Sequence, residues 1–151
     1  MARFRYSLQN VLDIKLKMET QAKQEFSAMK NALDEEEAKL TALYDRKHMY
    51  EQEAESLRIG SLRILDLEAN QNALLIMDEY IADQKEQVNK AARRLDEARV
   101  KLTEVMKERK TQETLKDKAF EEFLQEENRA ESKAVDELTS YTYGQKRQVK
   151  G

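Results

Sequence analysis

The sequence predicts an all-α fold, in which two helices form a long antiparallel coiled-coil hairpin. Charged residues make up 38% of the 151 residues, proline is absent and only three glycines occur, so few residues interrupt a helix. Apolar residues recur at intervals of three and four, the spacing that places them along one helical stripe. Gly60 lies between two such stretches and marks a region where the chain can turn.

The first helix is expected from about residue 6 to about residue 58. Two lines of residues seven apart, offset by four, mark its packing face. The first line holds Ala22, Met29, Leu43, Tyr50 and Leu57, and the second holds Phe26, Leu33, Leu40 and Ala54. Glu36 interrupts the first line and Lys47 interrupts the second. The other positions are apolar, so this face is expected to pack along a partner helix.

The turn region is expected between residues 59 and 72. Gly60 followed by Ser61 suits a helix stop and a new N-cap. Asn70 and Asn72 offer a later turn as an alternative. Because two long helices would then be joined by one short connection, the simplest arrangement is an antiparallel hairpin.

The second helix is expected to run to about residue 141, followed by a frayed basic tail over residues 142–151. Its first line, with members seven apart, holds Leu67, Leu74, Ile81, Val88, Leu95 and Leu102. Its second line begins at Asn70 and continues with Met77, Gln84, Ala91, Ala98 and Val105. Because the first line fails at Arg109 and Lys116, the apolar pattern is expected to resume in a new frame at Phe120. The whole chain is thus expected to be a single coiled-coil domain.

Several classes of function are excluded by composition and motifs. The chain has no cysteine for a disulfide or a thiolate metal site. Its longest apolar run, Ala73 to Met77, is far shorter than the roughly 20 residues of a membrane span. No phosphate-binding loop G-x-x-x-x-G-K-[ST] occurs, so the chain is not expected to be an enzyme that hydrolyses nucleotide. No secretion signal is evident, so the expected location is the cytoplasm.

Metal, cofactor and nucleic acid are not expected either. His48 shares a helical face with Asp45 and Glu51, but a lone histidine among carboxylates is better explained as part of a solvated face. The net charge is −3, which does not favour nucleic acid. The basic stretch Lys85 to Lys110 is interleaved with acidic residues and lacks aromatic residues for base stacking.

The stretch EENRAESKAVDE, residues 126–137, has few apolar residues, namely Ala130, Ala134 and Val135. Because the second helix is expected to be longer than the first, this stretch would lie at the open end of the hairpin, where little of the partner helix remains. It is there either as a solvated helix end or as a surface that binds another protein.

The stretch ALLIMDEYI, residues 73–81, holds more apolar residues than the seam uses. Leu75, Ile76 and Tyr80 lie outside the seam lines and project elsewhere on the helix. They either pack against the connection or a third helix, or they form a patch for a partner protein. The candidate patch has the i, i+4, i+7, i+11 spacing of a docking helix and comprises Ala73, Met77, Tyr80 and Gln84.

Two segments near the ends of the chain resemble flagellar FliJ proteins. The opening FRYSLQNVLDIKLKMET is similar to that family's aromatic–x–aromatic–x–leucine start of a long helix. The later FLQEENRAESKAVDELTSY resembles the family's E-N-R followed by spaced Lys and Asp-Glu. The matching residues are Glu127, Asn128, Arg129, Lys133, Asp136 and Glu137.

The resemblance implies a non-enzymatic component of the flagellar type III export apparatus, similar to the central stalk of rotary ATPases. The partners implied are the hexameric export ATPase, whose ring receives the open end of the hairpin, the cytoplasmic domain of the export gate, and export chaperones. The implied location is cytoplasmic, at the base of the export apparatus, and peripheral to the membrane through partners only.

The residues expected at these contacts follow from the same resemblance. The ATPase-ring contact comprises the six matching residues, and Arg3 and Arg5 are expected to join them from the other helix at the open end. The export-gate contact is expected at Ala73, Met77, Tyr80 and Gln84. The alternative is a generic cytoplasmic coiled-coil scaffold or adaptor, in which the polar end is only a solvated terminus.

Overall fold

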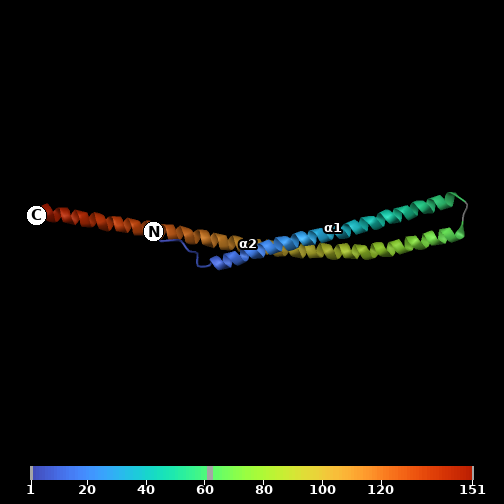
Figure 1. Cartoon of the computed structure of the whole chain (residues 1–151), viewed down its shortest axis with the longest axis horizontal. Helices are drawn as coiled ribbons and strands as arrows, with labels where there is room; N and C mark the ends of the chain where they lie inside the picture. Colours follow the sequence, from blue (N-terminus) through green and yellow to red (C-terminus); the bar gives the residue numbers. More distant parts are fainter. Residues whose placement is uncertain (1, 61–62, 151) are drawn as a thin grey trace. The chain divides into compact units, whose positions relative to one another are not determined.

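The computed structural model describes residues 2–60 and 63–150. These residues form two helices, α1 (Gln9–Ile59) and α2 (Ile64–Lys150), and no strand. The helices pack against each other in opposite directions (Figure 1), so the predicted all-α hairpin is confirmed. The chain divides into two compact units: unit 1 comprises Met1–Glu19 with Val105–Gly151, and unit 2 comprises Thr20–Glu104.

Unit 2 holds the connection between the helices. Cross-helix pairs within it run in opposite order along the two helices, because Lys101 Nζ lies 3.2 Å from the Glu25 carboxylate whereas Asn70 bonds to Tyr50. Apart from Ala32, the buried and half-buried positions of α1 within unit 2 fall on the two predicted lines. The sevenfold spacing therefore identified the packing face of this helix.

The core of unit 2 is thin. Its most buried apolar side chains are Ala22, Met77, Ile81, Ala91 and Ala98, all at most 6% exposed. Each seam side chain is covered by one opposing helix, so most leucines of the seam stay half-buried. Burying a side chain of the size of isoleucine contributes about 1.5–3 kcal/mol, so the hairpin depends on many such contacts in series.

Polar residues within the seam of unit 2 are paired across it. Gln84 Nε2 donates to the Glu36 carbonyl oxygen at 2.9 Å and also to the Glu36 carboxylate. The buried Asn70 donates through Nδ2 to the Tyr50 carbonyl oxygen at 3.0 Å. A buried amide that lacked such a partner would cost about 1–3 kcal/mol, so these pairs favour one register of the two helices over its neighbours.

Unit 1 begins with a segment before α1 that packs against α2. The Phe4 ring meets the Phe120 ring edge-on, with centroids 5.1 Å apart, and lies 5.4 Å from the Phe123 ring. Tyr6 Oη donates to Gln112 Oε1 at 3.3 Å. We call Phe4, Phe120 and Phe123 the aromatic clasp, because their contacts hold the non-helical N-terminal segment on the helix.

The helix boundaries differ in detail from the expected ones. α1 begins at Gln9, where the Gln9 amide donates to the Tyr6 carbonyl at 3.1 Å, rather than near residue 6. α2 begins at Ile64, so Asn70 lies within the helix. Ser61, expected as an N-cap, lies outside the described residues. α2 extends to Lys150 rather than ending near residue 141, because proline is absent and Gly144 alone adds only about 1 kcal/mol of helix penalty.

The seam in unit 1 keeps the sevenfold frame. Arg109, Lys116 and Phe123 are each half-buried at the positions where the first line of α2 continues. The frame change expected at Phe120 is therefore wrong. Its physical reason is local, because Arg109 remains in the seam by pairing with the Glu19 carboxylate, and a charged residue at that position does not end the packing.

Neither helix contains, over its described residues, a stretch long and apolar enough to cross a membrane.

Candidate partner-binding sites

Among the described residues of unit 1, those of the C-terminal part of α2 are not packed against another segment. Every residue from Asn128 to Gln145 is exposed. Local bonds support the helix there, since Thr142 Oγ1 donates to the Leu138 carbonyl oxygen at 2.8 Å and Gln145 Nε2 donates to Tyr141 Oη at 2.9 Å. All sides of this segment, which we call the free helix (residues 128–145), are available to another protein.

The residues expected at the ATPase ring lie on and beside the free helix. Arg129, Lys133 and Asp136 follow i, i+4, i+7 spacing and so share one side of it. Their side chains make no hydrogen bond or ion pair within the described chain. Asn128 and Glu137 occupy other sides of the helix and are also exposed, whereas Glu127, one turn beyond Phe123, is half-buried.

Arg3 and Arg5 flank Phe4 in the N-terminal segment, and both are exposed. Because Phe4 is held in the aromatic clasp, the two arginines lie near the turn of α2 that carries Phe120 and Phe123. Asp136 lies thirteen residues beyond Phe123, about 20 Å along the helix axis. Arg3 and Arg5 therefore lie beside the clasp, whereas Asp136 and Glu137 lie further along the helix.

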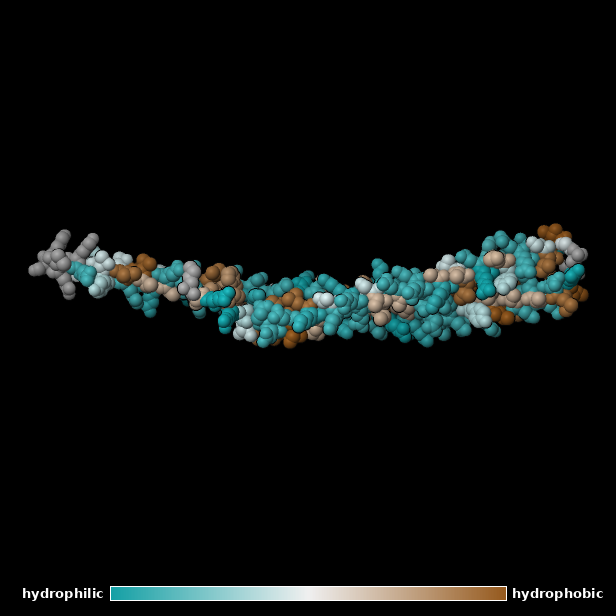
Figure 2. Space-filling model, viewed as in Figure 1, coloured by the Kyte–Doolittle hydropathy of each residue, from teal (hydrophilic) through white to brown (hydrophobic). Residues whose placement is uncertain are grey.

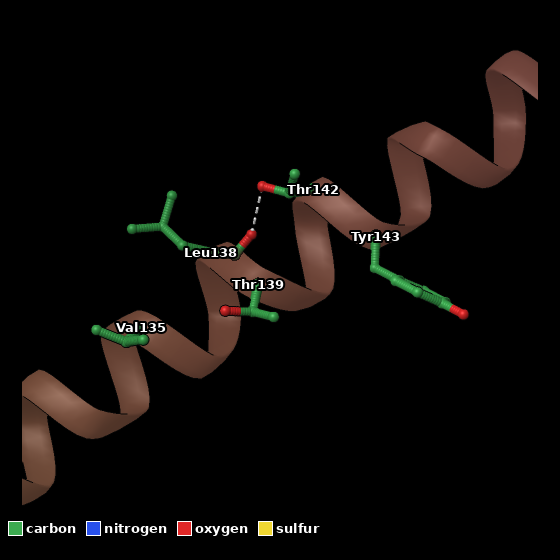
Figure 3. Close-up of a pocket in the computed structure, with 5 residues that line it drawn as sticks. All are labelled: Val135, Leu138, Thr139, Thr142 and Tyr143. Atoms are coloured by element: carbon green, nitrogen blue, oxygen red, sulfur yellow. Dashed lines mark hydrogen bonds between the residues drawn. The ribbon is translucent and has the colours of Figure 1, made fainter.

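An apolar face on the free helix was not singled out in the sequence. Val135, Leu138, Thr139, Thr142 and Tyr143 line a shallow depression along one side (Figure 3). Within residues 126–137, the sequence offers only Ala130, Ala134 and Val135 as apolar residues. The i, i+3, i+7 spacing of Val135, Leu138 and Thr142 is the signal that would have found this face.

The residues expected at the export gate do not form one exposed surface in the free chain. Met77 is only 5% exposed in the seam, and Gln84 is engaged with Glu36. Ala73 is half-buried. Tyr80 alone is largely open, at 53% exposure. The four residues straddle the border between the seam and the surface of α2.

Charges on the two helices of unit 2 also meet at Lys47, which interrupts a seam line. Lys47 Nζ lies 2.8 Å from Asp78 Oδ1 and 4.0 Å from Glu51 Oε1. The hydrogen bond to Asp78 and the charge of Asp78 raise the pKa of Lys47 above its ordinary value. Lys47 therefore remains protonated at any physiological pH and holds α1 to α2 at this level.

The surroundings of His48 support a solvated face. His48 Nδ1 lies 3.9 Å from Glu51 Oε2, and its Nε2 lies 3.3 Å from Gln52 Nε2, all on the exposed side of α1. Among residues 2–60 and 63–150, no group of three or more His, Cys, Asp or Glu side chains is placed to hold a metal ion.

Comparisons with known proteins agree with the hairpin. A search of curated proteins found no match. Among solved structures, a YscO homologue from Chlamydia trachomatis is similar, with a TM-score of 0.65, 24% sequence identity and coverage of 97% of this chain and 99% of that chain. This likeness concerns the fold.

A family model described as Flagellar FliJ protein matches residues 4–148. The match spans both the aromatic clasp and the free helix, and leaves out only a few residues at each end. The chain therefore belongs to the flagellar FliJ protein family.

Proposed function

We propose that this chain is a non-enzymatic stalk of the flagellar type III export apparatus. Its free helix enters the ring of the hexameric export ATPase, the early part of α2 contacts the cytoplasmic domain of the export gate, and the chain also engages export chaperones. Membership of the FliJ family points to a component of a type III export apparatus. The contacts with the ring, the gate and the chaperones are proposed in addition to this role.

The observation that carries the proposal is the free helix. A helix surrounded by subunits of a ring must offer contacts on all sides, and residues 128–145 are exposed on all sides. Arg129 and Lys133 supply cations on one side, and the depression beside Leu138 supplies an apolar face on another. If residues 128–145 packed against another helix of the chain, the same surface would be buried and could not contact a ring.

The charged groups of the free helix suit reversible contact with a ring. Arginine binds a carboxylate through two parallel hydrogen bonds, which gives orientation as well as attraction. Exposed ion pairs each contribute less than about 1 kcal/mol and are weakened by salt. The association of ring and stalk should therefore weaken as ionic strength rises.

The gate contact is proposed at Tyr80 and the exposed edge of Ala73. Met77 and Gln84 would take part only where the partner reaches the border of the seam. Changing Tyr80 to Ala should weaken gate binding while helicity stays unchanged. A matched change of Met77 to Ala should lower the melting temperature as well, since Met77 is buried against α1.

The proposal is tested by ATPase stimulation with the purified full chain. Arg129→Glu combined with Lys133→Glu should abolish stimulation of the export ATPase and leave the melting temperature unchanged. The matched control is Lys90→Glu with Arg94→Glu, which has the same i, i+4 spacing and the same change of charge on an exposed face of unit 2.

Two outcomes would contradict the proposal. Normal stimulation by the Arg129 and Lys133 variant would reduce the free helix to a solvated end, as in a generic coiled-coil scaffold. Equal loss of stimulation in the Lys90 and Arg94 control would show that total charge, and not the free helix, matters.

A further inference from the structure

The first turns of α2 expose large apolar side chains on the side away from α1. Leu65 is 79% exposed, Leu75 is 63% exposed and Ile76 is 45% exposed. The seam at this level is already filled by other residues of α2, among them Met77 and Ile81. Figure 2 shows apolar surface gathered at the end of unit 2 that holds the connection.

Two of these side chains form one strip, and the third lies at its edge. At 100° per residue, Leu65 and Ile76 lie within about 20° of one line opposite the seam, whereas Leu75 lies about 80° from that line, on the side that also carries Glu68 and Glu79. Ala69 and Asn72 fill the positions between them, so no charged residue separates Leu65 from Ile76 along the middle of the strip. Leu65 and Ile76 are about 17 Å apart along the axis. We call this surface, defined by Leu65, Leu75 and Ile76, the outer face of α2.

Nothing in the described part of the chain covers the outer face. Ile59, at the end of α1, is itself 88% exposed and so does not shield it. A helix that is apolar on its outer side as well as in its seam is normally buried on both sides. An exposed apolar surface of this kind marks a contact with another molecule.

The charges around the outer face are all of one sign. Residues 64–84 contain no Lys, Arg or His, in a chain with 27 Lys and Arg. Asp78 is paired with Lys47. The remaining acidic residues of the stretch are exposed and, in the part of the chain that the structure describes, have no ion pair; they are Asp66, Glu68, Glu79 and Asp83.

We propose that the outer face docks an amphipathic helix of a partner protein, with an apolar stripe flanked by lysine or arginine. The apolar strip supplies the buried contact, and the acidic rim selects the flanking charge. A second copy of this chain would bring two acidic rims together, and an anionic membrane would repel the same rim. Ile76 lies four residues before Tyr80, so the outer face borders the proposed gate contact, but the proposal does not depend on ring insertion or on the gate contact.

The test measures binding of synthetic helical peptides to the full chain by fluorescence anisotropy. One peptide carries a leucine stripe flanked by lysine, and the other carries the same stripe flanked by glutamate. The lysine peptide should bind, and salt should weaken it, whereas the glutamate peptide should not bind. Leu75→Ser with Ile76→Ser should lower the affinity roughly tenfold or more, as expected for losing two apolar contacts.

Matched variants separate the outer face from general attraction to an acidic protein. Ile14→Ser with Val100→Ser removes two apolar side chains that are also more than half exposed, at 56% and 59%, and should leave binding unchanged. Glu68→Lys with Glu79→Lys should weaken the lysine peptide and allow the glutamate peptide to bind. Circular dichroism should be the same for all variants.

Other outcomes would overturn the proposal. They include no binding of either peptide, equal binding of both, or equal loss in the Ile14 and Val100 control. Sedimentation showing self-association that Leu75→Ser with Ile76→Ser abolishes would assign the face to a second copy of the chain. Binding to phosphatidylglycerol vesicles that the same variant abolishes would assign it to a membrane.

Discussion

Glu19 and Arg109 are charged residues that face each other in the seam of unit 1. Their side chains are 8% and 18% exposed, and Arg109 Nη1 also lies 2.8 Å from Glu113 Oε2. Arg109 Nε lies against the Glu19 carboxylate without an aligned hydrogen bond, so charge attraction is the main link between them. A pair of this kind specifies which residues face each other more than it adds stability.

Removing one member of this pair should destabilise the chain more than removing both. Glu19→Leu alone should cost on the order of 3 kcal/mol, because Arg109 stays partly desolvated and keeps only the exposed Glu113 as a counterion. Glu19→Leu with Arg109→Leu should recover most of that loss, because leucine suits both seam positions. Urea unfolding followed by circular dichroism measures both values. Additive losses in the double variant would refute the coupling.

The ion pair of Lys47 with Asp78 predicts a dependence on alkaline pH. Because the folded pKa of Lys47 is raised, its contribution is fully present below the ordinary lysine pKa of about 10.4 and is lost as pH rises through the folded value. Asp78→Asn should therefore lower the melting temperature slightly at pH 8, and the difference should shrink above about pH 10.4. A difference that stays constant across this range would contradict it.

The seam residues that the sequence could not explain are the polar ones. Glu36 and Lys47 read as interruptions of apolar lines, because a sevenfold pattern shows which residues share a face and not which residue of the other helix they meet. Their partners Gln84 and Asp78 lie 48 and 31 positions away along the chain. Which residues face each other depends on the register of the two helices, and the structure shows this register.

At the scale of the helix, both predicted lines of α2 face α1, but they are not equivalent. Ala91, Ala98 and Val105 on the second line are buried, whereas Leu95 and Leu102 on the first are half-buried. The sevenfold spacing does not show which line is buried more deeply, because the depth of burial depends on how α2 is rotated towards α1. The same ambiguity explains why Met77 and Tyr80 were grouped on one expected face although the structure buries one and exposes the other.

A charge placed in the seam should unfold the hairpin, and a charge on the surface of the same helix should not. Leu95→Asp should cost on the order of several kcal/mol, because the carboxylate loses water without gaining a partner. Val100→Asp, at an exposed position five residues further on, should stay within about 0.5 kcal/mol of the parent. Equal melting temperatures for the two variants would show that the assigned seam is wrong.

At the scale of the whole chain, the fold followed from periodicity, whereas the function came from two short segments. Heptads are shared by many unrelated coiled coils, so the lines through α1 and α2 predict a hairpin and nothing about its partners. The family match over residues 4–148 agrees with the resemblance of those segments. The ring and gate residues stay predictions, because exposure at Arg129 or Tyr80 makes a contact possible without identifying the partner.

Removing the free helix should separate folding from function. Among the described side chains that truncation after Gln125 deletes, only Glu127 is half-buried and the others are exposed. The melting temperature should therefore stay within about 1 °C of the parent, the shift expected from a change of only a few tenths of a kcal/mol. Stimulation of the export ATPase should be lost. A truncated chain that stimulates normally would place the ring contact elsewhere, in which case Arg3 and Arg5 become the first residues to test.

The aromatic clasp also supplies an optical reporter. The chain contains no tryptophan, so Phe4→Trp would introduce a single indole beside Phe120 and Phe123, partly shielded from water as long as the N-terminal segment stays on α2. The emission maximum of this indole would shift to longer wavelength if ATPase binding displaces the N-terminal segment from α2. It would not shift if the segment stays bound to α2. Tryptophan fluorescence would then show whether the chain binds the ATPase as a preformed hairpin or releases its N-terminal segment from α2 on binding.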